Sequence, residues 1–214
     1  MNRKSIPIIF AIVLACLVMA YMDCVVQPGY AAKSAIKLLL FSAAAFGCGF
    51  RGGLRREGLR FALVLGGMIF AVILGAFFLF RSFIDLDSIA AGMLKKEGIS
   101  RENFLWVALY ISIVNSFLEE LLFRGLAYLQ LRRFAGEGFA MVFSAAAFAL
   151  YHVAILRGWF VWWVYALCLL GLFVGGLIFN ALDRRGSLLP SWLAHAAANL
   201  AINIIGMMMF TPIA

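Results

Sequence analysis

The sequence predicts an all-α integral membrane protein: a polytopic bundle of about seven transmembrane helices, with six to eight as the range. Hydrophobic residues make up 65% of the 214 positions and charged residues only 13%, whereas soluble proteins average about 25% charged. Apolar runs of about 20 residues recur, and that length crosses the ~30 Å hydrocarbon core as a helix. No long polar stretch interrupts them, so residues 1–214 are expected to form one membrane domain.

The expected spans are separated by segments that contain glycine, proline and charged residues. They cover residues 6–26, 33–50, 59–80, 103–131, 138–156, 159–182 and 188–210. Arg3 and Lys4 precede the first apolar run as in a signal peptide, but no clean small-x-small cleavage site follows. We therefore expect an uncleaved first helix.

The one long connection, residues 81–101, is predicted to contain a short helix. Asp87 or Ser88 can cap its start, and Gly98 fits the position after its end. Its apolar positions are Ile89, Ala90, Met93 and Leu94. A helix lying in the membrane interface is expected, and a lid that guides substrate is the alternative.

Basic residues bound the spans and predict the topology. The formal net charge is +8, but these residues are scattered between apolar runs, which suits anionic lipid headgroups and not nucleic acid. The side of the N-terminus carries ten: Arg3, Lys4, Arg51, Arg55, Arg56, Arg60, Arg132, Arg133, Arg184 and Arg185. The opposite side carries seven: Lys33, Lys37, Arg81, Lys95, Lys96, Arg101 and Arg157. This excess predicts an N-terminus inside the cell and a C-terminus outside.

Three apolar spans contain polar residues that lipid would not tolerate. They are Glu119, Glu120 and Arg124 in one span, His152 in the next, and His195 with Asn199 in the last. Each ionised side chain at the bilayer centre costs about 2.5–3.5 kcal/mol on insertion scales. Such residues usually face the bundle interior and mark a functional site.

Helical spacing assigns different surroundings to the two adjacent glutamates. Glu120 and Arg124 are one turn apart and predict an ion pair within the helix. Glu119 points about 100° away and is left to face a cavity, on one stripe with Ser112, Asn115 and Ser116. Ser191, His195, Asn199 and Asn203 form a second polar ridge. Of these residues, Ser112, Asn115 and Asn203 are expected to hydrogen-bond between helices without taking part in chemistry.

A carboxylate, two imidazoles and an amide suit peptide hydrolysis. Glu119 with His152 could hold and deprotonate a water, and His195 with Asn199 could donate hydrogen bonds to the developing oxyanion. No cofactor is favoured. Zinc on Glu119, His152 and His195 is the alternative, because two imidazoles and a carboxylate are a known catalytic ligand set.

Three strings resemble the motifs of the CAAX protease and bacteriocin-processing family, also called the Abi family. EELLFR (119–124) matches EExxxR, Phe148 to His152 matches FxxxH, and His195 to Asn199 matches HxxxN. The resemblance covers residues 103–210, which would form the catalytic core, whereas the spans within residues 1–81 are generic.

The family resemblance implies a membrane-embedded endopeptidase of the CAAX type. In the family, the residues matching Glu119 and His152 are thought to activate water, those matching His195 and Asn199 to form the oxyanion site, and Glu120 and Arg124 complete the motif. The expected substrate is a peptide or protein, with or without an attached lipid, and the expected location is the bacterial cytoplasmic membrane.

Two other functions compete with the protease. A non-proteolytic scaffold, immunity or regulatory protein could use the same fold, with His195 and Asn199 serving only as interhelical hydrogen bonds. A proton-coupled transporter fits less well, since no internal repeat is visible.

Overall fold

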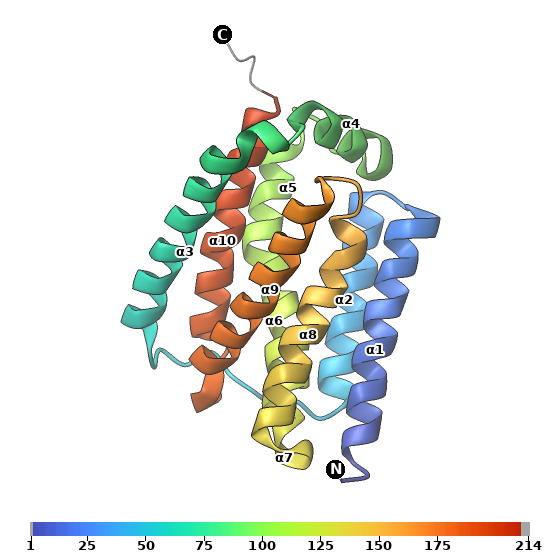
Figure 1. The fold of residues 1–214 in the computed structure, drawn as a ribbon. Coiled ribbons are helices and arrows are strands. Elements are labelled where there is room, and N and C mark those ends of the chain that lie inside the picture. The colour runs from blue at the N-terminus through green and yellow to red at the C-terminus, as the bar shows by residue number, and fades with distance from the viewer. Residues whose placement is uncertain (1, 211–214) are drawn as a thin grey trace.

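The computed structural model describes residues 2–210 and shows a bundle of long helices with a short helix lying across one end (Figure 1). The α-helices are α1 (Ser5–Tyr21), α2 (Tyr30–Gly47), α3 (Leu59–Phe80), α4 (Leu86–Glu97), α5 (Phe104–Tyr110), α6 (Ser116–Glu120), α7 (Arg132–Ala135), α8 (Glu137–Ile155), α9 (Trp162–Leu182) and α10 (Leu189–Met208). The described part of the chain contains no β-strand beyond isolated bridges. The prediction of an all-α bundle is confirmed.

Six helical segments of the described chain are long and apolar enough to cross a membrane. They correspond to six of the expected spans and run over Ser5–Val26, Leu59–Phe83, Phe104–Ala135, Glu137–Ile155, Trp162–Arg185 and Leu189–Met208. The remaining expected span is α2, which lies beside α1 in the bundle (Figure 1) but is made less apolar by Lys33 and Lys37. Large apolar side chains cover the outside; Trp162, for example, is 81% exposed.

The central helix of the bundle is not a uniform α-helix. Between Phe104 and Ala135 the α-helical segments α5, α6 and α7 alternate with π-helical stretches, η3 (Ile111–Asn115) and η4 (Leu121–Gln130). A π-helical turn is wider than an α-helical one and often occurs at functional sites. Here the two stretches flank α6, the short segment that carries Glu119 and Glu120.

Small residues let the outer helices approach the core. A Cβ atom on Gly66 of α3 would lie 3.3 Å from the Cβ of Ala197 on α10, and one on Gly176 of α9 would lie 2.9 Å from the Cα of Ala145 on α8. Membrane helices commonly use small residues in this way, because lipid provides no hydrophobic driving force between them. These contacts pack α3 against α10 and α9 against α8.

Helix α4 lies across the end of the bundle opposite the N-terminus (Figure 1). Asp85 caps it, accepting a hydrogen bond from the Ser88 backbone N–H at 3.0 Å, and hydrogen bonds from Ser88 lower the pKa of Asp85. The expectation that Asp87 or Ser88 is the cap was wrong, because the helix begins two to three residues earlier than those caps require, at Leu86. Gly98 ends it with φ 67°, as expected.

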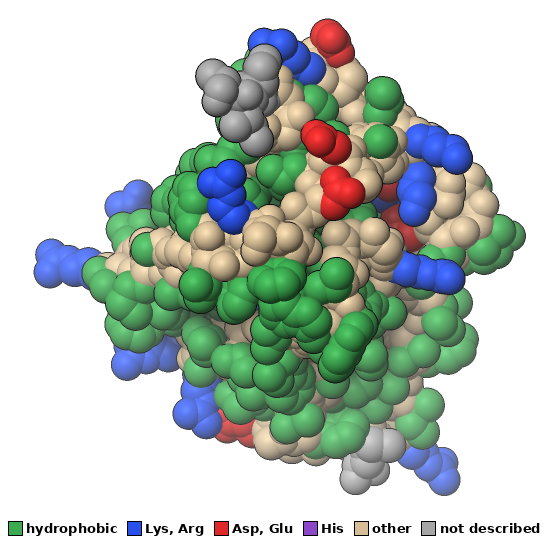
Figure 2. Space-filling view, turned by 45° about the horizontal axis from the view of Figure 1, so that its top comes forward, with side chains coloured by type: hydrophobic (Ala, Val, Ile, Leu, Met, Phe, Trp, Pro, Cys, Tyr) green, Lys and Arg blue, Asp and Glu red, His purple; other side chains and the backbone are tan. Residues whose placement is uncertain are grey.

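Figure 2 views the α4 end and shows charged side chains gathered there above a largely hydrophobic flank. No histidine is visible on this face.

Candidate active site

The structure brings Glu119, His152 and His195 together in the bundle interior, from α6, α8 and α10. Glu119 and His195 are buried, with 2% and 5% of their surface exposed, and His152 is mostly buried. The Oε2 atom of Glu119 lies 3.7 Å from His152 Nε2 and 3.6 Å from His195 Nε2. These separations exceed a direct hydrogen bond and match a site where one water could contact all three groups.

Hydrogen-bond partners assign the tautomer of each histidine. His152 Nδ1 lies 2.8 Å from the Phe148 carbonyl oxygen, which can only accept, so Nδ1 carries the proton. His195 Nδ1 lies 2.6 Å from Glu120 Oε1, a carboxylate that likewise accepts. In the neutral rings both Nε2 atoms therefore present a lone pair toward Glu119 Oε2.

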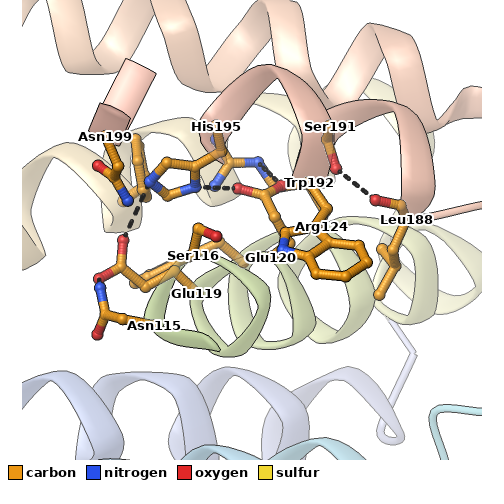
Figure 3. Close-up of polar contacts among 12 residues, drawn as sticks. Asn115, Ser116, Glu119, Glu120, Arg124, Leu188, Ser191, Trp192, His195 and Asn199 are labelled. Atoms are coloured by element: carbon orange, nitrogen blue, oxygen red, sulfur yellow. Dashed lines mark hydrogen bonds and ion pairs between the residues drawn. The ribbon is translucent and has the colours of Figure 1, made fainter. Parts of the chain in front are cut away.

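Glu120 connects His195 to Arg124. Its second oxygen lies 3.2 Å from Arg124 Nε, which is the intrahelical ion pair expected from the spacing. The Arg124 guanidinium is fully buried between the rings of Phe148 and Phe179, 4.1 and 5.0 Å from their centroids. This ion pair supplies a cation behind the carboxylate that orients His195 (Figure 3).

Lys37 completes the charge balance of the site, although the sequence analysis counted it only among the basic residues on the side opposite the N-terminus. Its Nζ lies 2.7 Å from Glu119 Oε1 and 2.5 Å from Asn115 Oδ1, and only 6% of the residue is exposed. The Asn115 amide also donates to Glu119 Oε1 at 3.0 Å. One oxygen of Glu119 is therefore held by Lys37 and Asn115, while the other faces the two imidazoles. Asn115 joins helices as expected, through Lys37 of α2, and it also contacts the candidate catalytic carboxylate (Figure 3).

The other members of the α10 ridge bind different partners. Ser191 hydrogen-bonds to the buried Asp183, which caps the start of α10. Asn203 donates to Ser112 Oγ and to the Ala108 carbonyl, both at 3.0 Å, which confirms its expected role between helices.

Asn199 lies one turn from His195 and donates from Nδ2 to the Ile111 carbonyl at 3.1 Å. An amide nitrogen carries two hydrogens, so the second remains for a ligand. His195 can donate from Nε2 only as an imidazolium, whose counter-charge would be Glu120. The expected oxyanion role of this pair therefore requires a protonated His195.

The described residues contain no group of three His, Cys, Asp or Glu side chains arranged to hold a metal ion. The Lys37 cation lies within 3 Å of Glu119 Oε1 and would repel a second cation there.

Comparison with known families gives one match, to the type II CAAX prenyl endopeptidase Rce1-like family model over residues 101–201. No curated protein and no solved structure matches the chain. The matched segment starts before α5 and ends within α10, and it contains every motif residue that the structure gathers around Glu119. Residues 101–201 of this membrane protein thus match the Rce1-like type II CAAX prenyl endopeptidase family, in agreement with the family that the sequence motifs resemble.

Proposed function

We propose that this protein is an intramembrane endopeptidase that hydrolyses a peptide bond with a water activated by Glu119. The observation that carries the proposal is the convergence of Glu119 Oε2 with two imidazole Nε2 atoms at 3.6 and 3.7 Å. A water between them can donate to two of these acceptors and direct a lone pair at a carbonyl carbon. The family match supports the same reaction class.

Each residue then has a defined task. Glu119 accepts the proton of the attacking water and returns it to the leaving amine nitrogen as the C–N bond breaks, and His152, fixed by the Phe148 carbonyl, orients that water. His195, as an imidazolium stabilised by Glu120, and Asn199 donate hydrogen bonds to the oxyanion. Lys37 and Asn115 position the Glu119 carboxylate by holding its other oxygen. The substrate is a peptide or protein segment that reaches the membrane, with or without an attached lipid.

The test compares purified wild-type protein with Glu119→Gln, incubated in detergent or liposomes with a complex peptide mixture and analysed by mass spectrometry. The wild type should produce new peptide termini, and Glu119→Gln should produce none above background. Glu57→Gln, the same change on an exposed glutamate, is the matched control and should cleave normally. Full activity in folded Glu119→Gln would remove Glu119 from the mechanism.

A second arm separates the glutamate mechanism from zinc catalysis. A metal chelator should leave the cleavage rate unchanged if Glu119 alone activates water. Loss of activity that zinc restores would instead assign Glu119, His152 and His195 as metal ligands.

A further inference from the structure

A cavity of about 240 Å³ lies between α4 and the rest of the bundle. Its roof is formed by one side of α4 and by the 157–159 turn, and its floor by α2, η3 and the end of α8. None of the residues that line the cavity, Ala154 among them, belongs to the motifs that carry the family resemblance.

The cavity floor is one helical turn from the candidate active site on three separate helices. Lys33 precedes Lys37 by four residues on α2, and Ile111 precedes Asn115 by four residues in η3. On α8, which runs the other way (Figure 1), Ile155 follows His152 by three residues. At 1.5 Å per residue these steps correspond to about 4–6 Å. All three helices therefore place the cavity on the α4 side of Glu119.

We propose that this cavity is the subsite through which an extended peptide segment reaches Glu119 from the α4 face, with α4 as its cover. The proposal rests on the proposed endopeptidase function. An extended chain advances about 3.3–3.6 Å per residue, so roughly two residues bridge the floor and the catalytic groups. The volume is below the ~300–1,000 Å³ of drug-sized pockets, which suits a short stretch of chain.

The lining also favours a peptide over a lipid tail. Charged groups such as Lys33 and Glu97 alternate with apolar ones such as Ile89, Met93 and Trp159. This mixture offers polar contacts to a peptide backbone and contact area to its side chains, whereas an acyl chain would place hydrocarbon against the polar part of the lining.

Lys33 fastens the cover to the bundle. Its ammonium group pairs with Asp23 after α1 at 2.8 Å and with Glu97 at the end of α4. The three side chains are partly buried, with 7–22% exposed. Opening α4 at this end would break the Lys33–Glu97 pair, and a partly exposed pair is weak enough to open and close.

Gly92 provides a way to fill the cavity. It lines the cavity from α4, and a Cβ atom built on it would meet nothing within 4 Å. Gly92→Trp should therefore obstruct the space without a clash at the backbone. Gly75→Trp, on the exposed side of α3 with equally open space, is the matched control.

The first experiment measures access without requiring proteolysis. In a background with all four cysteines replaced by serine, Ala154→Cys is labelled with a membrane-impermeant methanethiosulfonate in vesicles of each orientation. It should react in the orientation that exposes Lys95→Cys at the α4 face, and not in the one that exposes Arg55→Cys.

Adding Gly92→Trp should slow labelling about tenfold or more, corresponding to ~1.4 kcal/mol, and adding Gly75→Trp should not. Glu97→Gln should speed labelling about twofold to fivefold, unlike Glu102→Gln.

Two results would overturn the proposal. One is labelling of Ala154→Cys in the vesicle orientation that exposes Arg55→Cys. The other is a labelling rate that Gly92→Trp leaves unchanged in a folded, monodisperse protein. A second experiment measures peptide cleavage by the same glycine variants, with the smaller Gly92→Leu as a check on folding. If the wild type cleaves and Gly92→Trp keeps the activity of Gly75→Trp, the cavity is not the peptide subsite. If the wild type cleaves nothing, the enzymatic function fails, whereas the labelling result still decides access.

Discussion

Lys37 is the residue on which the charge balance around Glu119 depends. Removing one partner of a buried ion pair leaves an uncompensated charge and costs about 3–5 kcal/mol. We expect Lys37→Met to lower the free energy of unfolding by that order and to abolish cleavage, and Lys37→Arg to retain part of both. Combining Lys37→Met with Glu119→Gln should recover most of the stability but no activity. Unfolding in mixed micelles measures the free energies of the wild type, the two single variants and the double variant. A Lys37→Met variant as stable as the wild type would contradict the prediction.

Glu120 provides the counter-charge of a protonated His195. In Glu120→Gln an amide replaces the carboxylate that accepts from Nδ1, so the imidazolium that donates to the oxyanion loses its negative partner. In a serine protease triad the carboxylate behind the histidine also orients the ring and stabilises the imidazolium, and replacing it by an amide lowers kcat by about 10⁴. We expect a loss of about 10²–10⁴ in kcat with a smaller change in KM. Cleavage kinetics test this, with Glu137→Gln on the surface as the control, and an unchanged kcat would show that Glu120 serves folding alone.

The sequence predicted which polar groups lie inside the bundle because each is a polar group in an apolar helix. Lipid excludes such groups, so Glu119, His152 and His195 were expected to meet there. Lys37 was missed because it was counted, together with Lys33, only as a topology-determining charge. The signal was present: Lys37 lies within the expected span 33–50 and is followed by three leucines, so a buried carboxylate partner should have been sought.

At the scale of elements, hydrogen bonds from α10 side chains to carbonyls of the central helix determine how α10 docks. Trp192 donates to Ile113 and Asn199 to Ile111, both in η3, and Asn203 donates to Ala108 in α5. These bonds align α10 with the central helix and so place His195 opposite Glu119.

Losing one of these docking bonds should weaken the fold without altering the chemistry. Interhelical hydrogen bonds in membranes average about 0.6 kcal/mol, with a maximum near 1.7. We expect Asn203→Ala to cost about 0.6–1.7 kcal/mol of unfolding free energy and to keep the turnover of the wild type. Ile202→Ala, at the adjacent exposed position, is the control. A larger fall in kcat than in stability would show that Asn203 acts on the site.

The order of helices and most of their boundaries followed from apolar run length, but the π-helical stretches did not. Regular α-helical spacing put Ser112, Asn115, Ser116 and Glu119 on one stripe. In the structure Asn115 and Glu119 meet Lys37, whereas Ser112 meets Asn203. A run of apolar residues does not show where a helix changes from α-helical to π-helical spacing. That change depends on the hydrogen-bond donors that a neighbouring helix offers to the backbone carbonyls.

At the scale of the whole molecule, charge is distributed very unequally between the two ends. The end with the N-terminus carries ten Lys/Arg and three Asp/Glu, whereas the α4 end carries six and five. The interior holds Lys37 and Arg124 against Glu119 and Glu120, and is balanced. A reporter fused to the N-terminus should therefore be found inside the cell. An N-terminal reporter outside would contradict this topology, and replacing Arg132 and Arg133 by glutamine should weaken the orientation.

The pairing of Lys37 with a carboxylate 82 residues further along the chain has a consequence for biogenesis. While the ribosome synthesises α2, its partner does not yet exist, and an unpaired lysine at mid-membrane costs about 2.5–3.5 kcal/mol on insertion scales. Nascent chains stalled after residue 80 should thus hold α2 loosely, and chains that include α6 should hold it firmly, as glycosylation mapping can measure. Equal insertion at both lengths would refute this. The ion pair that positions Glu119 in the folded protein would then also be the contact that docks α1 and α2 against the segment of residues 101–201 during synthesis.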